Sequence, residues 1–271
     1  MKIIAGLFVI VVISLWGCSK TISNEQLLQQ GIKKHTAGDF KGAILEFTTL
    51  IERNHQSAAA YYLRGSAKDE LGDLSGAVGD YNTAIELDPN NIDVYFWRGR
   101  VEIEMGDFSA AIRDFSKVIE ADSNNVNAYF YRGSTKSDLG DTTGAISDFS
   151  KVIELQPDHS VAYYNRGATK NEQNDYKGAL LDLTKSIELS PEYVDALYER
   201  GIAYRGLRKY TEAIHDFTKA IELNTNYAWA YYDRGMLTLA ISKNKQEALE
   251  DLIKARDLGD ERAVDAIKKL Q

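Results

Sequence analysis

Histidine and cysteine are the side chains most often used for catalysis and metal binding, and this sequence contains few of either. Among its 271 residues are four histidines, His35, His55, His159 and His215, and one cysteine, Cys18. Metal ligands and general bases stand at defined spacings from their partners, whereas these histidines share none. No Ser-His-Asp order, glycine-rich phosphate loop or zinc motif is present. We therefore assign no catalytic residue, metal ligand or cofactor, and we predict that the chain is not an enzyme.

Arginine and aspartate recur at a fixed spacing and predict ion pairing instead. Each arginine directly precedes a glycine, and an acid follows that glycine by fifteen residues, or by one more in the last copy. Where the first copy has Gln30 in place of arginine, the acid is Glu46 in place of aspartate. The two positions thus change together within one chain, and six copies indicate architecture rather than catalysis. The expected pairs are Arg64 with Asp80, Arg98 with Asp114, Arg132 with Asp148, Arg166 with Asp182, Arg200 with Asp216, and Arg234 with Asp251.

These pairs belong to a repeat that runs through most of the chain. Its glycines are evenly spaced, and an alanine follows each at a nearly constant distance. The second copy predicts helices over residues 60–71 and 75–87, because apolar residues recur at helical spacing on either side of Gly72-Asp73. A mid-helix glycine costs about 1 kcal/mol relative to alanine, so its repetition indicates that the two helices of each copy approach closely. The repeat glycines are Gly31, Gly65, Gly99, Gly133, Gly167, Gly201 and Gly235.

Strings such as YYLRG and LGDLSGAVGDYNTAIELDPNN resemble tetratricopeptide repeats, which are helix-turn-helix units of about 34 residues. The resemblance spans residues 24–259 in seven copies and implies an all-α, right-handed superhelical solenoid. Residues 260–271 resemble the C-terminal capping helix that covers the last apolar face of such a solenoid. Arginine stands where the family pattern has a core leucine, so we expect the Arg–Asp pairs to be partly buried. Tyrosine usually replaces the family's tryptophan four residues before the glycine.

The resemblance also implies a concave face, lined by the first helix of each repeat, that could bind a peptide. Aromatic residues recur along this stripe, and Trp97 and Trp229 are less expected there than tyrosine; tryptophan is enriched at binding hot spots. The aromatic ladder could instead pack adjacent repeats, and both interpretations remain open. The candidate groove residues are Tyr62, Asp69, Phe96, Trp97, Arg100, Glu104, Phe130, Tyr164, Tyr198 and Trp229.

Charge on the same stripe is strongly negative. Ten acids face only two cations, Arg100 and Arg205, and the whole chain carries a formal charge of −8. This balance disfavours nucleic acid, since phosphates would be repelled. No lysine stands at a groove position, so the lysine-containing clamp with which some tetratricopeptide proteins bind a C-terminal carboxylate is not expected here. We expect a protein or peptide ligand that is basic with apolar anchors, and no small-molecule substrate; the charges could also be only a solvated face. The acids are Glu25, Asp69, Glu70, Asp93, Glu104, Asp138, Glu172, Asp195, Glu199 and Asp233.

The N-terminus has the pattern of a secretory signal peptide. Lys2 precedes an apolar run, and Leu15-Trp16-Gly17-Cys18 resembles the lipobox of bacterial lipoproteins, although a small residue is usual at Trp16. This pattern predicts a signal peptide over residues 1–17, a lipidated Cys18 and a short tether over 18–23. The alternatives are an uncleaved short anchor or an ordinary signal peptide with an incidental cysteine. Ser19 after the cysteine favours the outer membrane by the sorting rule of enteric bacteria.

Together these features predict a lipid-anchored adaptor or scaffold of the bacterial cell envelope that binds protein partners through its concave face. Two alternatives stay open: a structural scaffold that self-associates through its ends, and a non-catalytic subunit of an envelope enzyme or secretion complex.

Overall fold

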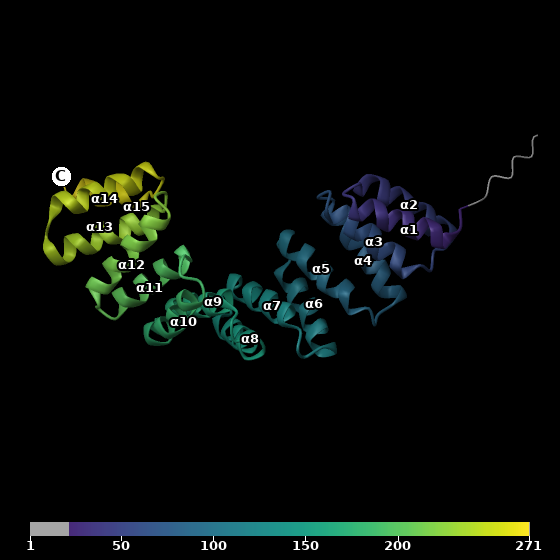
Figure 1. The fold of residues 1–271 in the computed structure, drawn as a ribbon, viewed down its shortest axis with the longest axis horizontal. Helices are drawn as coiled ribbons and strands as arrows, with labels where there is room; N and C mark the ends of the chain where they lie inside the picture. Colours follow the sequence, from purple (N-terminus) through teal and green to yellow (C-terminus); the bar gives the residue numbers. More distant parts are fainter. Residues whose placement is uncertain (1–21, 271) are drawn as a thin grey trace, which may run out of the picture.

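The computed structural model describes residues 22–270, which contain fifteen α-helices and no strand. The helices follow one another along an open arc, from the purple N-terminal pair to the yellow C-terminal pair (Figure 1). The predicted all-α solenoid is confirmed. The helices are α1 (Asn24–Thr36), α2 (Phe40–Arg53), α3 (Ala58–Asp69), α4 (Leu74–Leu87), α5 (Ile92–Glu104), α6 (Phe108–Ala121), α7 (Val126–Asp138), α8 (Thr142–Leu155), α9 (Ser160–Glu172), α10 (Tyr176–Leu189), α11 (Val194–Gly206), α12 (Tyr210–Leu223), α13 (Ala228–Ser242), α14 (Lys245–Asp257) and α15 (Arg262–Leu270).

In the first four repeats the turn between the two helices is built from a glycine and an aspartate. Gly72 takes the left-handed conformation at φ +77°, which costs a residue without Cβ very little. Asp73 then caps α4, its side chain accepting a hydrogen bond from the backbone N–H of Gly76. The same cap begins α2, α6, α8 and α10. The chain therefore reverses at a defined residue and starts each of these second helices with its first turn satisfied.

The two helices of each repeat pack closely at the recurring glycine. A Cβ added to Gly65 would lie 2.9 Å from Cε1 of Tyr81 and 3.2 Å from the carbonyl oxygen of Ala77, so a side chain there would force the two helices or the Tyr81 ring to shift. Ala77 and Tyr81 are completely buried. The repeated glycine is thus explained by the close approach of α3 and α4 rather than by backbone conformation.

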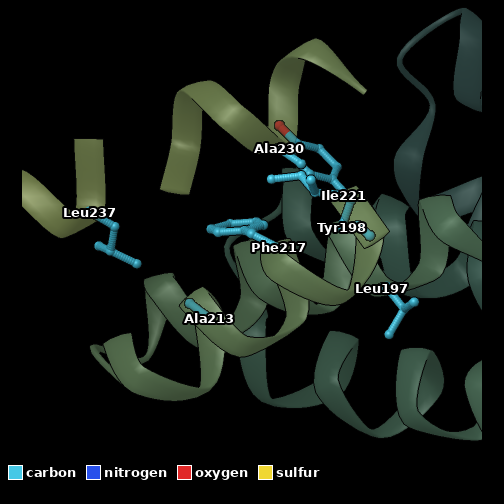
Figure 2. Close-up of a cluster of buried hydrophobic side chains, with 8 residues drawn as sticks. Leu197, Tyr198, Ala213, Phe217, Ile221, Ala230 and Leu237 are labelled. Carbon is cyan, nitrogen blue, oxygen red and sulfur yellow. The ribbon is translucent and has the colours of Figure 1, made fainter. Parts of the chain in front are cut away.

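Each repeat buries its apolar face jointly with the next one. Figure 2 shows this for the sixth repeat, where Phe217 of α12 lies among residues of α11 and α13 such as Tyr198 and Leu237. At the C-terminal end, α15 packs on α14 and buries Ala263 and Ile267 against Leu252. Helix α15 spans Arg262–Leu270, slightly less than the predicted 260–271.

The first helices of neighbouring repeats also touch one another directly, from α1 with α3 to α9 with α11. Such contacts place the first helices on the shorter, inner side of the arc. No helix in the described part of the chain is long and apolar enough to span a bilayer. Within residues 22–270 there is also no group of His, Cys, Asp or Glu that could hold a metal ion.

Candidate functional site

The structure brings the two members of all six expected Arg–Asp pairs together. In the fourth repeat the Nε and Nη2 atoms of Arg132 donate to the two carboxylate oxygens of Asp148, at 2.9 and 2.7 Å. The other five pairs have the same two-bonded geometry. The aspartate is the more buried partner, with only 3% of the Asp148 side chain exposed against 17% of Arg132. Each pair therefore fixes the first helix of a repeat to its second helix.

The same arginine also joins its repeat to the preceding one. Nη1 of Arg132 donates to Ser116 Oγ on α6 at 3.0 Å, and the guanidinium lies 5.5 Å from the ring centre of Tyr129. A lysine three residues after the repeat glycine adds a second cation, with Lys136 Nζ lying 2.8 Å from Asp148 Oδ2. Lys68 and Lys170 do the same in their repeats. These lysines recur at the repeat spacing in the sequence, and this spacing is the signal that could have added them to the predicted pairs.

The first repeat keeps this arrangement in a reduced form. It has no arginine at the paired position, and Lys34 takes over by lying 2.6 Å from the carboxylate of Glu46. The acid at this position is therefore neutralised in every repeat. Ion pairs that tie helices together in each unit are architectural, since no substrate could reach a carboxylate already held by a bidentate guanidinium.

The third repeat departs from the pattern, because Glu102 stands where the lysine is expected. Glu102 is 3.8 Å from Nε of Arg98, which already binds Asp114, and its Oε2 is buried without a hydrogen-bond partner among the described residues. Burial and the nearby Asp114 charge raise the pKa of Glu102 to about 7. One arginine thus faces two buried carboxylates in this repeat.

The aromatic candidates lie along the first helices, as their spacing predicts, but they differ in how open they are. Tyr62, Phe96, Phe130 and Tyr164 are half-buried. The first three of these rings contact the buried ring of their own repeat; for example, Phe96 lies 5.8 Å from Phe115 between ring centres. The ladder therefore does pack its own repeats, while part of each ring remains open to solvent.

The two tryptophans among the candidate groove residues offer different surfaces. The indole of Trp97 is half-buried, and the guanidinium of Arg100 lies 5.1 Å from its ring centre and 5.5 Å from that of Tyr131. Trp229 is 54% exposed, at the C-terminal end of the same face. A ligand would meet an open ring at Trp229, but at Trp97 it would meet a ring that already bears a cation.

Tyr198 is not available to a ligand in the way the sequence suggests. It is only 8% exposed, because Tyr227 and Trp229 pack against its ring and Phe217 lies beneath it. Its hydroxyl donates to Asp233 Oδ2 at 2.7 Å. Tyr198 is therefore a core residue of the sixth repeat, and spacing alone could not show this because two of the burying rings come from the next repeat.

The acids of the inner face fall into two groups. In the N-terminal half, Asp69 and Glu104 have no side-chain hydrogen bond or ion pair within residues 22–270. Burial and the charges of Glu104 and Glu70 raise the pKa of Asp69, while Arg100 opposes this. Asp69 and Glu104 therefore leave negative charge on this part of the inner face that no cation of the fold binds.

In the C-terminal half two of the acids are bound within the fold. Asp233 is 3% exposed and accepts hydrogen bonds from Tyr198 and Arg205. The carboxylate of Asp195 accepts a hydrogen bond from the Tyr227 hydroxyl at 2.9 Å. The count of ten free acids and two free cations therefore has to be corrected, because Asp233 and Arg205 form an internal pair.

Comparison with known families decides what this array is. Family models described as tetratricopeptide repeat or TPR repeat match residues 70–101, 98–160, 160–193 and 194–227, which together run without a gap through the middle of the chain. The chain belongs to the tetratricopeptide repeat family. Proteins of this family are typically non-catalytic scaffolds that bind other proteins or peptides.

Solved structures with the same architecture cover most of this tetratricopeptide protein. The MamA protein is 26% identical, with a TM-score of 0.60, over 64% of this chain and 95% of that one. A tetratricopeptide repeat protein from Parabacteroides merdae is 22% identical with a TM-score of 0.66, over 91% and 96% of the two chains. The C-terminal part of a TPR repeat-containing protein from Cytophaga hutchinsonii reaches a TM-score of 0.73 at 19% identity, over 88% and 98%. No curated protein sequence matches the chain significantly.

Cys18, the predicted lipidation site of this tetratricopeptide protein, lies outside the described residues. The first described residues lead directly into the first repeat, since Ser23 caps α1 and Arg53 Nη1 donates to the carbonyl of Ile22 at 2.6 Å. The chain therefore enters the first repeat beside Arg53, at the C-terminal end of α2.

Proposed function

We propose that this protein is a lipid-anchored adaptor of a bacterial cell envelope, most simply at the outer membrane, that recruits partner proteins through its inner face and has no catalytic activity. The observation that carries the proposal is an inner face on which half-buried aromatic rings alternate with acids that the fold leaves without partners. The lipid anchor rests on the lipobox-like residues before Cys18. The alternatives are a self-associating scaffold and a non-catalytic subunit of an envelope complex.

The inner face favours a basic segment with apolar anchors. The half-buried rings of Tyr62, Phe96 and Phe130 offer apolar area, and an aromatic ring attracts cations to its face. Asp69 and Glu104 add negative potential, which speeds the approach of basic segments and disfavours acidic ones.

Site-specific photo-crosslinking in native envelopes tests the proposal directly. A photoreactive residue in place of Trp97 should capture a partner, whereas one in place of Leu181, which is 75% exposed on the second helix α10, should not. If Leu181 captures the partner and the Trp97 position does not, the binding face is the outer one. If only further copies of the same chain are captured, the protein is a self-associating scaffold.

The charge and anchor components are tested separately. With the captured partner, reversing Asp69 and Glu104 to lysine should slow association and flatten its salt dependence, because the steering potential is lost. Trp97→Ala should act mainly through faster dissociation. Cys18→Ser should release the protein from washed membranes, since a stable anchor needs two or more acyl chains; membrane retention of this variant would contradict the lipid anchor.

A further inference from the structure

One pocket on the inner face holds a buried amide next to two acids that form no ion pair. It lies between α9 and α11, has a volume of about 300 Å³, and is lined by Asn171 and Glu172 of α9, Tyr176 of α10, and Glu199 and Ile202 of α11. The ring of Tyr176 reaches over Gly206, where a Cβ would lie 2.5 Å from the ring. No other repeat has an amide at the position of Asn171, so the pocket depends on a local change in sequence. The equivalent residues are His35, Asp69, Ile103, Ser137, Arg205 and Leu239.

Asn171 is built into this pocket and is only partly satisfied. It is 8% exposed, and its Nδ2 donates both to the backbone carbonyl of Glu199 at 2.9 Å and to the Glu199 carboxylate at 2.8 Å. Its Oδ1, on the other branch of the amide, is buried with no partner among the described residues. An unpaired buried acceptor is costly, and the group that would satisfy it is a hydrogen-bond donor.

The charges around the pocket specify the kind of donor. Neither Glu172 nor Glu199 forms an ion pair within residues 22–270. The two cations of α11 are already engaged, Arg200 with Asp216 and Arg205 with Asp233. A cationic donor would therefore find two carboxylates and an amide oxygen, while the aliphatic and aromatic side chains of the pocket wall would cover its methylene stem.

We infer that this pocket receives one basic side chain, lysine or arginine, of the partner segment. The inference rests on the proposed function and deepens it, since it assigns one anchor of the ligand to one place on the array. Glu199 and Glu172 bind the charge, Asn171 Oδ1 accepts a further hydrogen bond, and the apolar wall selects a side chain with a long aliphatic stem. Other acids of the inner face then steer the segment without gripping a particular residue.

The test uses single amino acids, so that no partner needs to be known. Blocked lysine, blocked arginine and blocked norleucine, which has a comparable stem but no charge, are compared by saturation-transfer NMR on the full-length protein in detergent. We expect a clear signal for at least one of the two basic compounds and little for norleucine. Glu199→Gln should abolish that signal, and Glu172→Gln, at an exposed site where folding is not at risk, should weaken it.

The matched control is Glu192→Gln, which removes the same charge from an exposed, unpaired position just before α11 and outside the inner face. It should leave the signal unchanged. Equal signals for norleucine and the basic compounds, or equal losses in the Glu192 and Glu172 variants, would overturn the pocket assignment. If a partner still crosslinks at the Trp97 position in that case, the proposed function stands; if nothing crosslinks anywhere on the inner face, it is the proposed function that fails.

Discussion

The fourth and sixth repeats share one fold but differ in how completely their local interactions are satisfied. In the fourth, Asp148 binds both Arg132 and Lys136, and the turn has left-handed Gly140 followed by the capping Asp141. In the sixth, Asp216 binds Arg200, a tyrosine replaces the lysine, and the turn is Arg208-Lys209.

The difference shows which interactions the array requires and which it can lose. The bidentate Arg–Asp pair persists in both repeats. The lysine that also binds the aspartate, the left-handed glycine of the turn and the capping aspartate are all absent from the sixth repeat, so the fold can form without them. Tyr204, at the lysine position, supplies the ring over which Arg200 lies, at 5.8 Å, because Leu197 stands where other repeats have that tyrosine. Since each repeat of a solenoid contacts only its neighbours, stability should vary along the chain, with the sixth repeat weaker than the fourth.

Removing the paired arginine should lower the free energy of unfolding more than any other change, and the loss should be larger in the sixth repeat than in the fourth. Arg200→Ala should cost about 3–5 kcal/mol, because it strands a buried carboxylate. Asp216 would keep only His215, 3.3 Å away on a side chain that is 77% exposed. Arg132→Ala should fall at the lower end of this range, because Lys136 still neutralises Asp148. Urea unfolding of both variants measures the difference.

A double-mutant cycle controls for indirect effects of the arginine. Arg132→Ala combined with Asp148→Ala should cost less than the sum of the two single changes, because the second removal no longer strands a charge. A coupling energy near zero would mean that the observed pair contributes nothing to stability.

The third repeat extends the comparison, because it carries an acid at the lysine position. Glu102→Lys should restore the arrangement of the fourth repeat, and Glu102→Gln should remove the repulsion alone; each should stabilise by about 1–3 kcal/mol above neutral pH. The ordinary pKa of 4.5 is raised to about 7 in the fold. The folded state therefore binds the proton more tightly than the unfolded state, and stability falls as pH rises through this window.

The pH dependence of the stability gain separates relief of the charge repulsion at Glu102 from a change in packing. The advantage of Glu102→Gln over the unaltered protein should be small near pH 4.5 and grow until about pH 7. An advantage independent of pH would assign the effect to packing.

Capping should account for a smaller part of the difference between the fourth and sixth repeats. Lys209 precedes α12 without a side-chain hydrogen bond and places a positive charge at the positive end of the helix dipole. Lys209→Asp should recover about 1 kcal/mol. In the unaltered protein, backbone hydrogen exchange should be faster over residues 208–245 than over 77–154. Lys209→Asp should slow exchange at the start of α12. Uniform protection along the array would contradict a weak sixth repeat.

The sequence was sufficient for features that repeat and insufficient for features that depend on one neighbour. The regular spacing of the repeat glycines predicted the solenoid, and the joint change to Gln30 and Glu46 pointed to the Arg–Asp pairs. The burial of Tyr198 and the pairing of Asp233 could not be predicted, because Trp229 and Arg205 reach them across a repeat boundary whose angle no single-copy pattern encodes. The unpaired Oδ1 of Asn171 likewise depends on how α9 meets α11.

Replacing the left-handed residue of the turn should change stability least, but whether each replacement stabilises or destabilises is clearly predicted. Arg208 adopts φ +60°, a left-handed conformation that costs a residue with Cβ about 1–2 kcal/mol. Arg208→Gly should remove that strain, but glycine also has more freedom to lose on folding, so the net gain should be at most about 1 kcal/mol. Gly140→Arg, the reverse change in the fourth repeat, should destabilise by a similar amount. In the seventh repeat the inserted residue moves the left-handed position to Lys243, so Ser242→Gly should fail to stabilise while Lys243→Gly succeeds. Thermal unfolding of these four variants measures all the signs; a stabilising Ser242→Gly would mean that backbone strain does not set the difference between the turns.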